Sequence, residues 1–218
     1  GPILEHEEKT IGVVQGAQGQ HWYEITITGQ EAHAGPTPMA RRKDALVAAS
    51  KIVAEVNRIG LDNQPYACAT VGLIQSSPNS RNTIPGEVFF TVDFRHPKDE
   101  ILSKMDAELR SFSEKIASEG GYEMKFEQIW YSPPVEFDSD CVKAVRTGAE
   151  IAGYSHMDII SGAGHDACYI NRVAPTGMIF VPCENGISHN EEEEATPEDL
   201  AAGCNVLLHA VVERANVA

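Results

Sequence analysis

The stretch Trp22-Tyr23-Glu24-Ile25-Thr26-Ile27-Thr28 alternates bulky apolar residues with polar ones and is rich in aromatic and β-branched side chains. This pattern is typical of a half-buried β-strand. Residues 31–38 follow with two prolines and a glycine, which predicts a loop. Residues 41–59 then repeat apolar side chains every three or four positions, which predicts an amphipathic helix that Gly60 ends.

The same reasoning extends along the chain to residue 130. Two further strands are predicted at residues 66–74 and 87–94, a helix at residues 99–119 that stops at Gly120-Gly121, and a strand at residues 122–130. The resulting order is β-α-β-β-α-β. That order predicts an α+β, ferredoxin-like fold in which two helices cover one face of an antiparallel sheet.

A short apolar stretch, Ile11 to Val14, lies before the first strand. At the other end of the β-α-β-β-α-β segment, Pro133-Pro134 marks a boundary, after which helices and strands follow in a different order. Beyond the two prolines we do not find enough strands for a complete sheet, so this part is expected to be the tail of a larger α/β domain. Its predicted elements are a helix at 139–152, a strand at 157–160, a Gly-rich turn at 161–164, a helix at 165–171, a strand at 176–181 and a helix at 197–215.

Composition excludes several classes of protein. With 218 residues, 42% hydrophobic and 22% charged, the chain is typical of a globular protein. Its formal net charge of −15 argues against nucleic-acid binding, because an acidic surface repels phosphate backbones. No apolar run is long enough to predict a transmembrane helix, and no basic-then-apolar pattern near residue 1 predicts a secretory signal. The five cysteines are odd in number and widely spaced, which favours free thiols in a cytoplasmic protein.

Two clusters in the first part of the chain carry candidate chemistry. His33 lies in a loop between rigid Gly and Pro residues, where it is either an ordinary solvated histidine or a side chain held for a site. Asn82 precedes the strand that carries Asp93 and Arg95 on one face. Arg95 can present a planar fork to a carboxylate, and the alternative is a surface ion pair with Asp93.

Two more clusters lie after Pro134. The glycine-rich turn with Gly164 and His165 comes between a strand and a helix, where backbone N–H groups can approach a ligand. His165 and Asp166 are either a pair that acts in catalysis or supports a ligand, or simply the cap at the start of the helix, and taken alone they favour the cap. His189 precedes the run Glu191 to Glu194, and a histidine followed by acids suits a metal ligand, although one histidine cannot define a metal site. The acidic run is also typical of a solvated loop.

Taken together, six motifs resemble one family in their order and spacing: GPILE (1–5), QGAQGQHWYE (15–24), GQEAHAGPTPM (29–39), PNSRNTIPGEVFFTVDFRHP (78–97), SGAGHDA (161–167) and VPCENGISHNEEE (181–193). They look like the hydantoinase/carbamoylase-type amidohydrolases. That family includes the N-carbamoyl-L-amino acid hydrolases, allantoate amidohydrolase and β-ureidopropionase, and it belongs to the zinc-peptidase superfamily. The resemblance covers essentially the whole chain.

The resemblance implies an organisation in three segments. Residues 18–132 correspond to an inserted lid or dimerisation domain, which agrees with the β-α-β-β-α-β order. Residues 1–17 and 133–218 correspond to a remnant and the C-terminal part of an α/β zinc-peptidase-like catalytic domain. A homodimer formed through the lid is expected.

The resemblance also implies roles for individual residues. His33 matches a catalytic histidine that reaches into the partner subunit's site and polarises the scissile carbonyl. Substrate-binding positions match Gln20, Asn82, Arg95, Gly164 and His165, with Arg95 taking the substrate carboxylate. His189 matches a ligand of the second metal ion.

The expected activity is hydrolysis of the carbamoyl C–N bond of N-carbamoyl-L-amino acids or related ureido acids such as allantoate. The cofactor would be two divalent metal ions, drawn from Zn, Mn, Co or Ni. The remaining metal ligands and the general-base glutamate of the family precede Gly1, so the chain is expected to hold an incomplete site and to be inactive alone. The alternatives are an aminoacylase or dipeptidase specificity, or a non-catalytic dimerisation or ligand-binding module.

Overall fold

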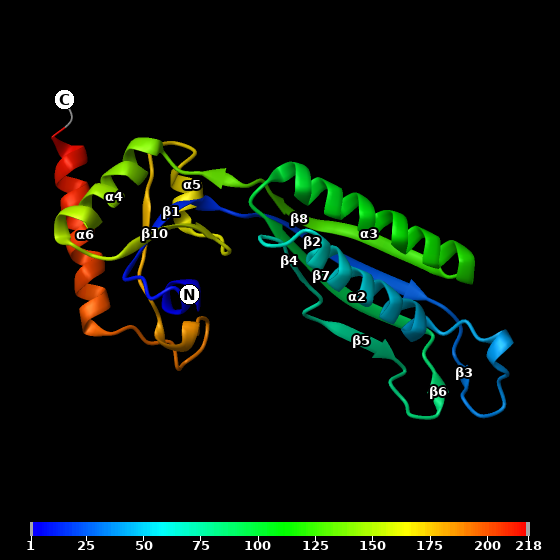
Figure 1. The fold of residues 1–218 in the computed structure, drawn as a ribbon. Coiled ribbons are helices and arrows are strands. Elements are labelled where there is room, and N and C mark those ends of the chain that lie inside the picture. Colours follow the sequence, from blue (N-terminus) through cyan, green and yellow to red (C-terminus); the bar gives the residue numbers. More distant parts are fainter. Residues whose placement is uncertain (1, 217–218) are drawn as a thin grey trace. The chain divides into compact units, whose positions relative to one another are not determined.

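The computed structural model describes residues 2–216 (Figure 1). The chain divides into two compact units. Unit 1 comprises Gly1–Gln18 with Val135–Ala218, and unit 2 comprises Gly19–Pro134. Each unit has its own cluster of buried apolar side chains.

Unit 2 is built on a five-stranded antiparallel sheet. Its longest strands are β2 (Gly19–Thr28), β7 (Glu87–His96) and β8 (Glu123–Ser132), and β2 lies between the other two. Two short strands, β4 (Cys68–Thr70) and β5 (Ile74–Ser77), both pair with the outer side of β7. The sequence predicted one strand over residues 66–74. The structure divides that segment, because residues 71–73 belong to neither strand, although the Leu73 carbonyl still accepts a hydrogen bond from the N–H of Thr91 in β7.

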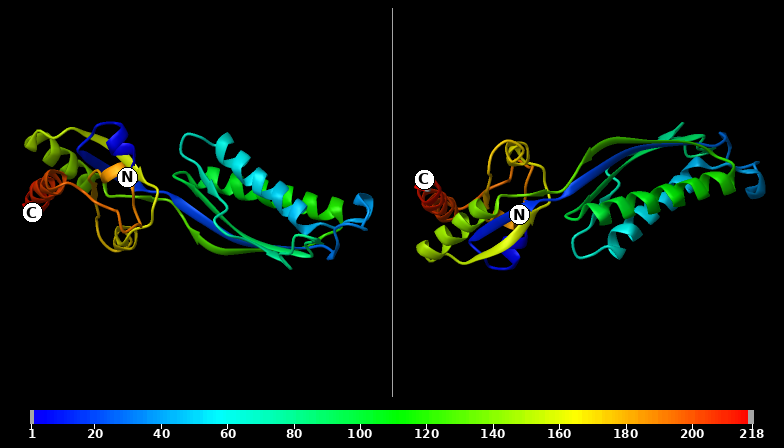
Figure 2. Two further views of the ribbon diagram at one scale, coloured as in Figure 1. Left: turned by 90° about the horizontal axis from the view of Figure 1, so that it is seen from below. Right: turned by 90° about the horizontal axis from the view of Figure 1, so that it is seen from above.

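Two helices, α2 (Ala45–Asp62) and α3 (Asp99–Gly120), cover one face of this sheet, as Figure 2 shows. Alternate residues of β2 and β7 point into the core beneath them, so that Tyr23, Phe90 and Phe94 are fully buried. Ile52 and Leu109 meet them from the two helices. The predicted ferredoxin-like β-α-β-β-α-β fold is confirmed, with the other face of the sheet left without a helix.

Helix α2 differs from its predicted bounds for local reasons. It begins at Ala45 rather than residue 41, because Asp44 caps it by accepting hydrogen bonds from the N–H groups of Leu46 and Val47. Gly60 was predicted to end the helix but lies inside it. A Cβ at Gly60 would stand 2.7 Å from the Cβ of Ala69, so this glycine permits the helix to approach β4 closely.

The predicted loop after β2 contains a short strand, β3 (Ala32–His33), which pairs with β6 (Thr83–Ile84) in a separate two-stranded sheet. A 3-10 turn at Met39–Arg41 follows the predicted loop, and its last residue had been assigned to the helix. Figure 1 shows β3 and β6 side by side at one end of unit 2. This small sheet was not predicted from the sequence.

Unit 1 has a four-stranded mixed sheet centred on β1 (Ile11–Ala17). β10 (His156–Ser161) runs parallel to β1 on one side, and β11 (Met178–Phe180) and β9 (Val135–Glu136) pair with it in antiparallel fashion. The strands after Pro134 form this sheet together with β1, which supplies its central strand. The pairing of β1 with β10 shifts register between Val14 and Gly16. A glycine is required at position 16, because a Cβ there would lie 2.1 Å from the Val135 carbonyl oxygen.

The helices of unit 1 follow the predicted bounds closely. α4 (Ser139–Ala152) and α6 (Pro197–Ala215) pack on each other and on the sheet, and three short helical segments complete the unit: α1 (Pro2–His6), α5 (Asp166–Ile170) and η2 (Glu184–Gly186). Among residues 2–216, none of the helices combines the length and the apolar character needed to cross a membrane.

Candidate functional site

The candidate residues fall into both units. His33, Asn82, Gln20 and Arg95 belong to unit 2, whereas Gly164, His165 and His189 belong to unit 1. Within unit 2 they form two pairs, one on the small sheet of β3 and β6 and one on the main sheet.

The first pair joins two clusters that lie far apart in the sequence. His33 ends β3 and stands opposite Thr83 of β6. The backbone N–H of Ala34 donates a hydrogen bond of 2.8 Å to the carbonyl oxygen of Asn82. The antiparallel pairing therefore places His33 and Asn82 at the same end of the small sheet, and both side chains are exposed.

The imidazole of His33 is oriented by its own loop. Its Nδ1 atom lies 3.1 Å from the backbone N–H of Gly35, which can only donate a hydrogen bond. Nδ1 is therefore the acceptor, and the neutral ring carries its proton on Nε2. The hydroxyl of Thr37 donates to the carbonyl oxygen of His33 at 2.7 Å. His33 can thus present an N–H donor to an oxygen atom of a ligand.

Asn82 lies in a turn that begins at Ser80. The Ser80 hydroxyl donates to Oδ1 of Asn82 at 2.9 Å, and the N–H of Thr83 donates to the Ser80 carbonyl at 3.2 Å. With its oxygen engaged in this way, the Asn82 side chain has its NH₂ group as the donor for an outside acceptor.

The second pair lies on the sheet face that carries no helix. Arg95 of β7 stands directly opposite Gln20 of β2, and Gln20 is buried. Asp93, two residues before Arg95, accepts hydrogen bonds from Nε at 3.1 Å and from Nη2 at 2.7 Å. The pKa of Arg95 is raised, chiefly by this hydrogen bonding with Asp93 and against the effect of burial. The ion pair considered from the sequence is present, but both groups are half-buried rather than on the open surface.

Gly164 and His165 lie in the turn between β10 and α5. His165 occupies the N-cap position of α5, but its side chain makes no capping hydrogen bond. Instead, its Nε2 atom lies 3.0 Å from the Ser161 hydroxyl, and its ring meets Phe180 edge to face at 5.6 Å between centroids. The simple interpretation of His165 as a helix cap is therefore correct for its position and wrong for its side chain.

His189 lies in the exposed loop between β11 and α6. Its φ of 56° is left-handed, and its backbone N–H donates to a carboxylate oxygen of Glu193 at 2.9 Å. Glu191 to Glu194 are exposed, as expected of a solvated loop. Within residues 2–216, no three His, Cys, Asp or Glu side chains gather in a group that could hold a metal ion. The assignment of His189 as a ligand stays a prediction.

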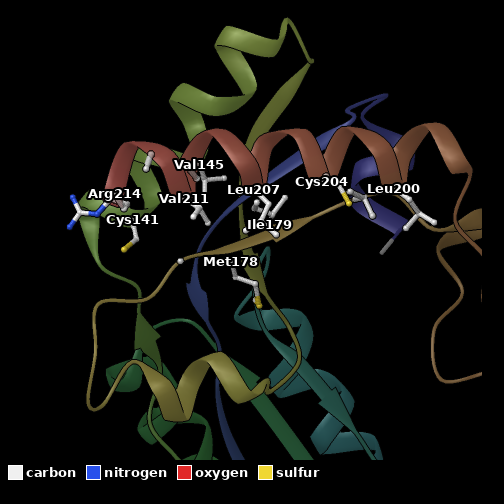
Figure 3. A pocket seen from close by; sticks show the side chains of 14 residues that line it. Cys141, Val145, Met178, Ile179, Leu200, Cys204, Leu207, Val211 and Arg214 are labelled. Atoms are coloured by element: carbon white, nitrogen blue, oxygen red, sulfur yellow. The ribbon is translucent and has the colours of Figure 1, made fainter. Parts of the chain in front are cut away.

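An apolar depression on unit 1 is a separate feature. An open groove of about 520 Å³ runs between α4, α6 and β11, and Figure 3 shows Val145, Ile179 and Leu207 among the side chains that line it. Its lining contains no histidine or carboxylate and none of the candidate residues. The titratable side chains in its lining are Cys141, Cys204 and Arg214, and among residues 2–216 no three metal-ligating side chains gather there.

Comparison with known proteins agrees with the motifs and the fold. Residues 1–213 match the profile of the peptidase family M20/M25/M40. The chain is 48% identical over 217 residues to an N-carbamoyl-L-amino-acid amidohydrolase of Rhizobium meliloti, covering 100% of this chain and 52% of that protein. It is 34% identical over 211 residues to an allantoate amidohydrolase of Escherichia coli K12, covering 95% of this chain and 50% of that protein.

Solved structures give the same result. A crystal structure of an amidase of the hydantoinase/carbamoylase family from Burkholderia multivorans matches with a TM-score of 0.95 and 66% identity, covering 99% of this chain and 52% of that one. The chain spans about half the length of the relatives that it matches. Members of this family generally use divalent metal ions. The resemblance inferred from the motifs is confirmed, and the chain belongs to the peptidase family M20/M25/M40, with hydantoinase/carbamoylase-type amidases among its relatives.

Proposed function

We propose that this chain is part of an amidohydrolase that cleaves the carbamoyl C–N bond of N-carbamoyl-L-amino acids or of related ureido acids such as allantoate. The observation that carries the proposal is the pairing of β3 with β6, which brings His33 and Asn82 to one end of a small sheet. Both side chains present N–H donors there. Relatives named for carbamoyl amino acid and allantoate hydrolysis support the choice of substrate class.

His33 is the proposed oxyanion donor. Its loop leaves the proton on Nε2, because Nδ1 accepts from Gly35. A donor aimed at the substrate carbonyl oxygen stabilises the negative charge that develops there as the carbonyl is attacked. In our proposal His33 supplies this hydrogen bond, in the site of the partner subunit, and Asn82 holds the polar end of the same substrate.

Arg95 is the proposed partner of the substrate carboxylate. A guanidinium group binds carboxylates through directed N–H bonds, and Asp93 holds this guanidinium in a fixed orientation. Gln20, directly opposite Arg95, adds an amide to the same surface. Gly164 and His165 are proposed to contact the substrate from the glycine-rich turn.

The proposed cofactor is a pair of divalent metal ions, for which Zn, Mn, Co and Ni are all suitable with imidazole and carboxylate ligands. His189 would supply one imidazole, and the acidic residues that follow it are of the kind that support such a ligand. Bound metal ions would activate water and polarise the carbonyl. Two features support His189 as a ligand: the residue is exposed, and its backbone N–H is held by the Glu193 carboxylate.

We further propose that unit 2 is a lid that pairs two chains in a homodimer. Its strand β8 is an edge of the main sheet, and Ile129, Trp130 and Tyr131 on it are exposed. Such an edge is suited to a two-fold contact between identical chains. A protein containing this chain that remained monomeric by light scattering at high concentration would contradict the action of His33 on a partner subunit.

The proposed compartment is the cytoplasm. All five cysteines are free in the structure, and two of them are exposed. Free thiols persist where the surroundings are reducing.

The direct test uses the full-length, metal-loaded protein with a panel of N-carbamoyl-L-amino acids, allantoate, N-acyl amino acids and dipeptides. We expect turnover of the ureido compounds. His33→Ala should lower kcat about 100-fold or more, as expected for loss of one oxyanion donor. His6→Ala is the matched control, because the His6 imidazole is exposed and its hydrogen bond within residues 2–216 is to the neighbouring Glu7. Turnover confined to N-acyl amino acids or dipeptides would favour an aminoacylase or dipeptidase.

The Arg95 assignment has its own test in the same assay. Arg95→Ala should raise KM for carboxylate-bearing substrates by about 10-fold or more, the usual value of a charged hydrogen bond. Arg95→Lys keeps the charge but loses the planar fork, so its KM should lie between those of the wild type and Arg95→Ala. If none of the substrates is turned over and the chain still binds one of them, a non-catalytic binding module becomes the better explanation.

A further inference from the structure

Arg42 lies half-buried between the 3-10 turn and α2, and its guanidinium is directed back toward the His33 loop. Its Nη2 group donates a hydrogen bond of 2.7 Å to the carbonyl oxygen of Ala34. Its Nε group donates a bond of 3.1 Å to the carbonyl oxygen of Thr37. The two acceptors lie on either side of the turn that follows His33.

This turn is the part of the loop that orients the imidazole. Gly35, whose N–H binds Nδ1, lies between the two carbonyls that Arg42 holds. Thr37, whose hydroxyl binds the carbonyl oxygen of His33, is itself one of the residues held by Arg42. The orientation of the ring and the position of its backbone therefore both depend on a turn that a single guanidinium fastens.

We propose that Arg42 is a positioning residue for His33. It does not touch the substrate, but it fixes the turn that sets the direction of the Nε2–H bond. This inference rests on the proposed function, because it takes the substrate carbonyl as the acceptor for His33. A planar guanidinium fits the role, since its separate N–H groups can reach two carbonyls at once, whereas a lysine ammonium has no such fork.

The rest of the loop is fixed without Arg42. At its base, the N–H of Gln30 donates to the Lys43 carbonyl at 2.8 Å, and the N–H of Ala34 donates to Asn82. Lys43 is engaged elsewhere, because its ammonium donates to the carbonyl of Gly121. Removing the Arg42 side chain should therefore loosen the turn at residues 34–37 and leave β3, β6 and α2 in place.

The test compares Arg42→Ala and Arg42→Lys with Arg41→Ala in the full-length, metal-loaded enzyme. Arg41 is the matched control, because it is the neighbouring arginine, is exposed, and has no hydrogen bond or ion pair from its side chain among residues 2–216. We expect Arg42→Ala to lower kcat about 10- to 100-fold with KM little changed, since a small misplacement of a catalytic group has effects of this size. Arg42→Lys should recover only part of the loss. Guanidinium ion at a non-denaturing concentration should raise kcat of Arg42→Ala and not that of His33→Ala.

A second measurement separates this inference from the proposed function. Hydrogen exchange should become faster in peptides covering residues 33–38 of Arg42→Ala, and stay unchanged across α2. If His33→Ala retains full activity, the proposed role of His33 fails, while the exchange data still decide whether Arg42 holds the turn. Unchanged kcat and unchanged exchange in Arg42→Ala would overturn the inference. So would a lower melting temperature of unit 2 together with a loss of activity that guanidinium does not restore.

Discussion

In unit 2, the core-facing residues of β2 and β7 are almost completely buried, and two long helices of the same unit cover them. In unit 1, all three residues of β11 remain half-exposed, and α6 displays five large apolar side chains that are each half or more exposed: Leu200, Leu207, Leu208, Val211 and Val212. The apolar groove of Figure 3 lies between these same elements. Unit 2 therefore encloses its core with its own residues, whereas unit 1 leaves part of its apolar surface open.

The units differ in how completely the apolar faces of their helices are covered, and not in the local signals that start those helices. Both units contain capped amphipathic helices, with Asp44 before α2, Asp138 before α4 and Thr196 before α6. What distinguishes unit 2 is that buried residues of α2 and α3 pack on the core-facing residues of β2 and β7 in one cluster. The comparison can be tested by substitutions matched between the two units.

The largest effect is expected from replacing one leucine by alanine in each unit of the 218-residue chain. Leu109 of α3 is completely buried, and Leu109→Ala should lower the free energy of unfolding by about 2–5 kcal/mol. Leu208 of α6 is 61% exposed, and Leu208→Ala should change it by no more than about 0.5 kcal/mol. Urea denaturation measures both variants. The fluorescence of Trp22 and Trp130, which lie in unit 2, follows Leu109→Ala, and hydrogen exchange across α6 follows Leu208→Ala. Similar losses for the two variants would show that the open face of α6 is covered in solution.

Much of this architecture could be predicted from the sequence. α4 and α6 have the predicted bounds, because caps, a proline at the first turn of α6 and the left-handed Gly153 are signals encoded within a few residues. The strands β2 and β7 were predicted for a similar reason, since their alternation is local. The predictions were wrong where a contact with a distant part of the chain decides the structure. Gly60 lies inside α2, where the absence of a Cβ allows the helix to approach Ala69 of β4.

In the candidate site, too, local motifs were predicted and contacts between distant segments were not. Motifs identified His33, Asn82 and Arg95, but no sequence pattern indicated that two-residue strands would join His33 to Asn82. Such short pairings have no periodicity to detect. Arg42 was assigned to the helix rather than to the His33 loop, and the available signal was only an arginine that follows the Gly- and Pro-rich stretch. Ser161 was likewise missed as the partner of His165, because its contact depends on the shape of the turn.

An intermediate effect is expected from the helix caps, and here the two units should behave alike. Asp44→Ala in unit 2 and Thr196→Ala in unit 1 each remove a side chain that accepts from backbone N–H groups at a helix start. Each should cost about 1 kcal/mol. Tryptophan fluorescence follows the first variant, and hydrogen exchange across α6 follows the second. A much larger loss for one of them would mean that the difference between the units lies in local helix signals and not in burial.

The smallest effect is expected from pH, and the two units should lose stability over different pH ranges. Burial lowers the pKa of His21 in unit 2 below 6.5, despite the opposing effect of Asp106. Because the folded state favours neutral His21, its contribution is complete above pH 6.5 and is lost as the pH falls below that value toward the lower folded pKa. In unit 1, the backbone N–H of Cys141 lowers the pKa of Asp138 below 3.8, so that contribution is lost only in stronger acid.

The urea midpoint followed by tryptophan fluorescence should therefore decrease between neutral pH and about pH 5. His21→Gln removes one titrating group and should flatten the decrease, leaving the part due to His96, whose pKa is also lowered by burial. A midpoint that is independent of pH over this range would contradict the assignment.

The ion pair of Arg95 and Asp93 has a consequence for how an anionic substrate would approach. Because the two charges offset one another at short distance, the pair projects little positive potential into solution, while the chain as a whole carries a formal charge of −15. Such a surface would attract a carboxylate weakly at long range and bind it only on contact, through directed N–H groups. Added salt would then screen mainly repulsion, so kcat/KM for an anionic substrate should stay level or rise with ionic strength, the opposite of an enzyme that draws in its substrate by electrostatic steering.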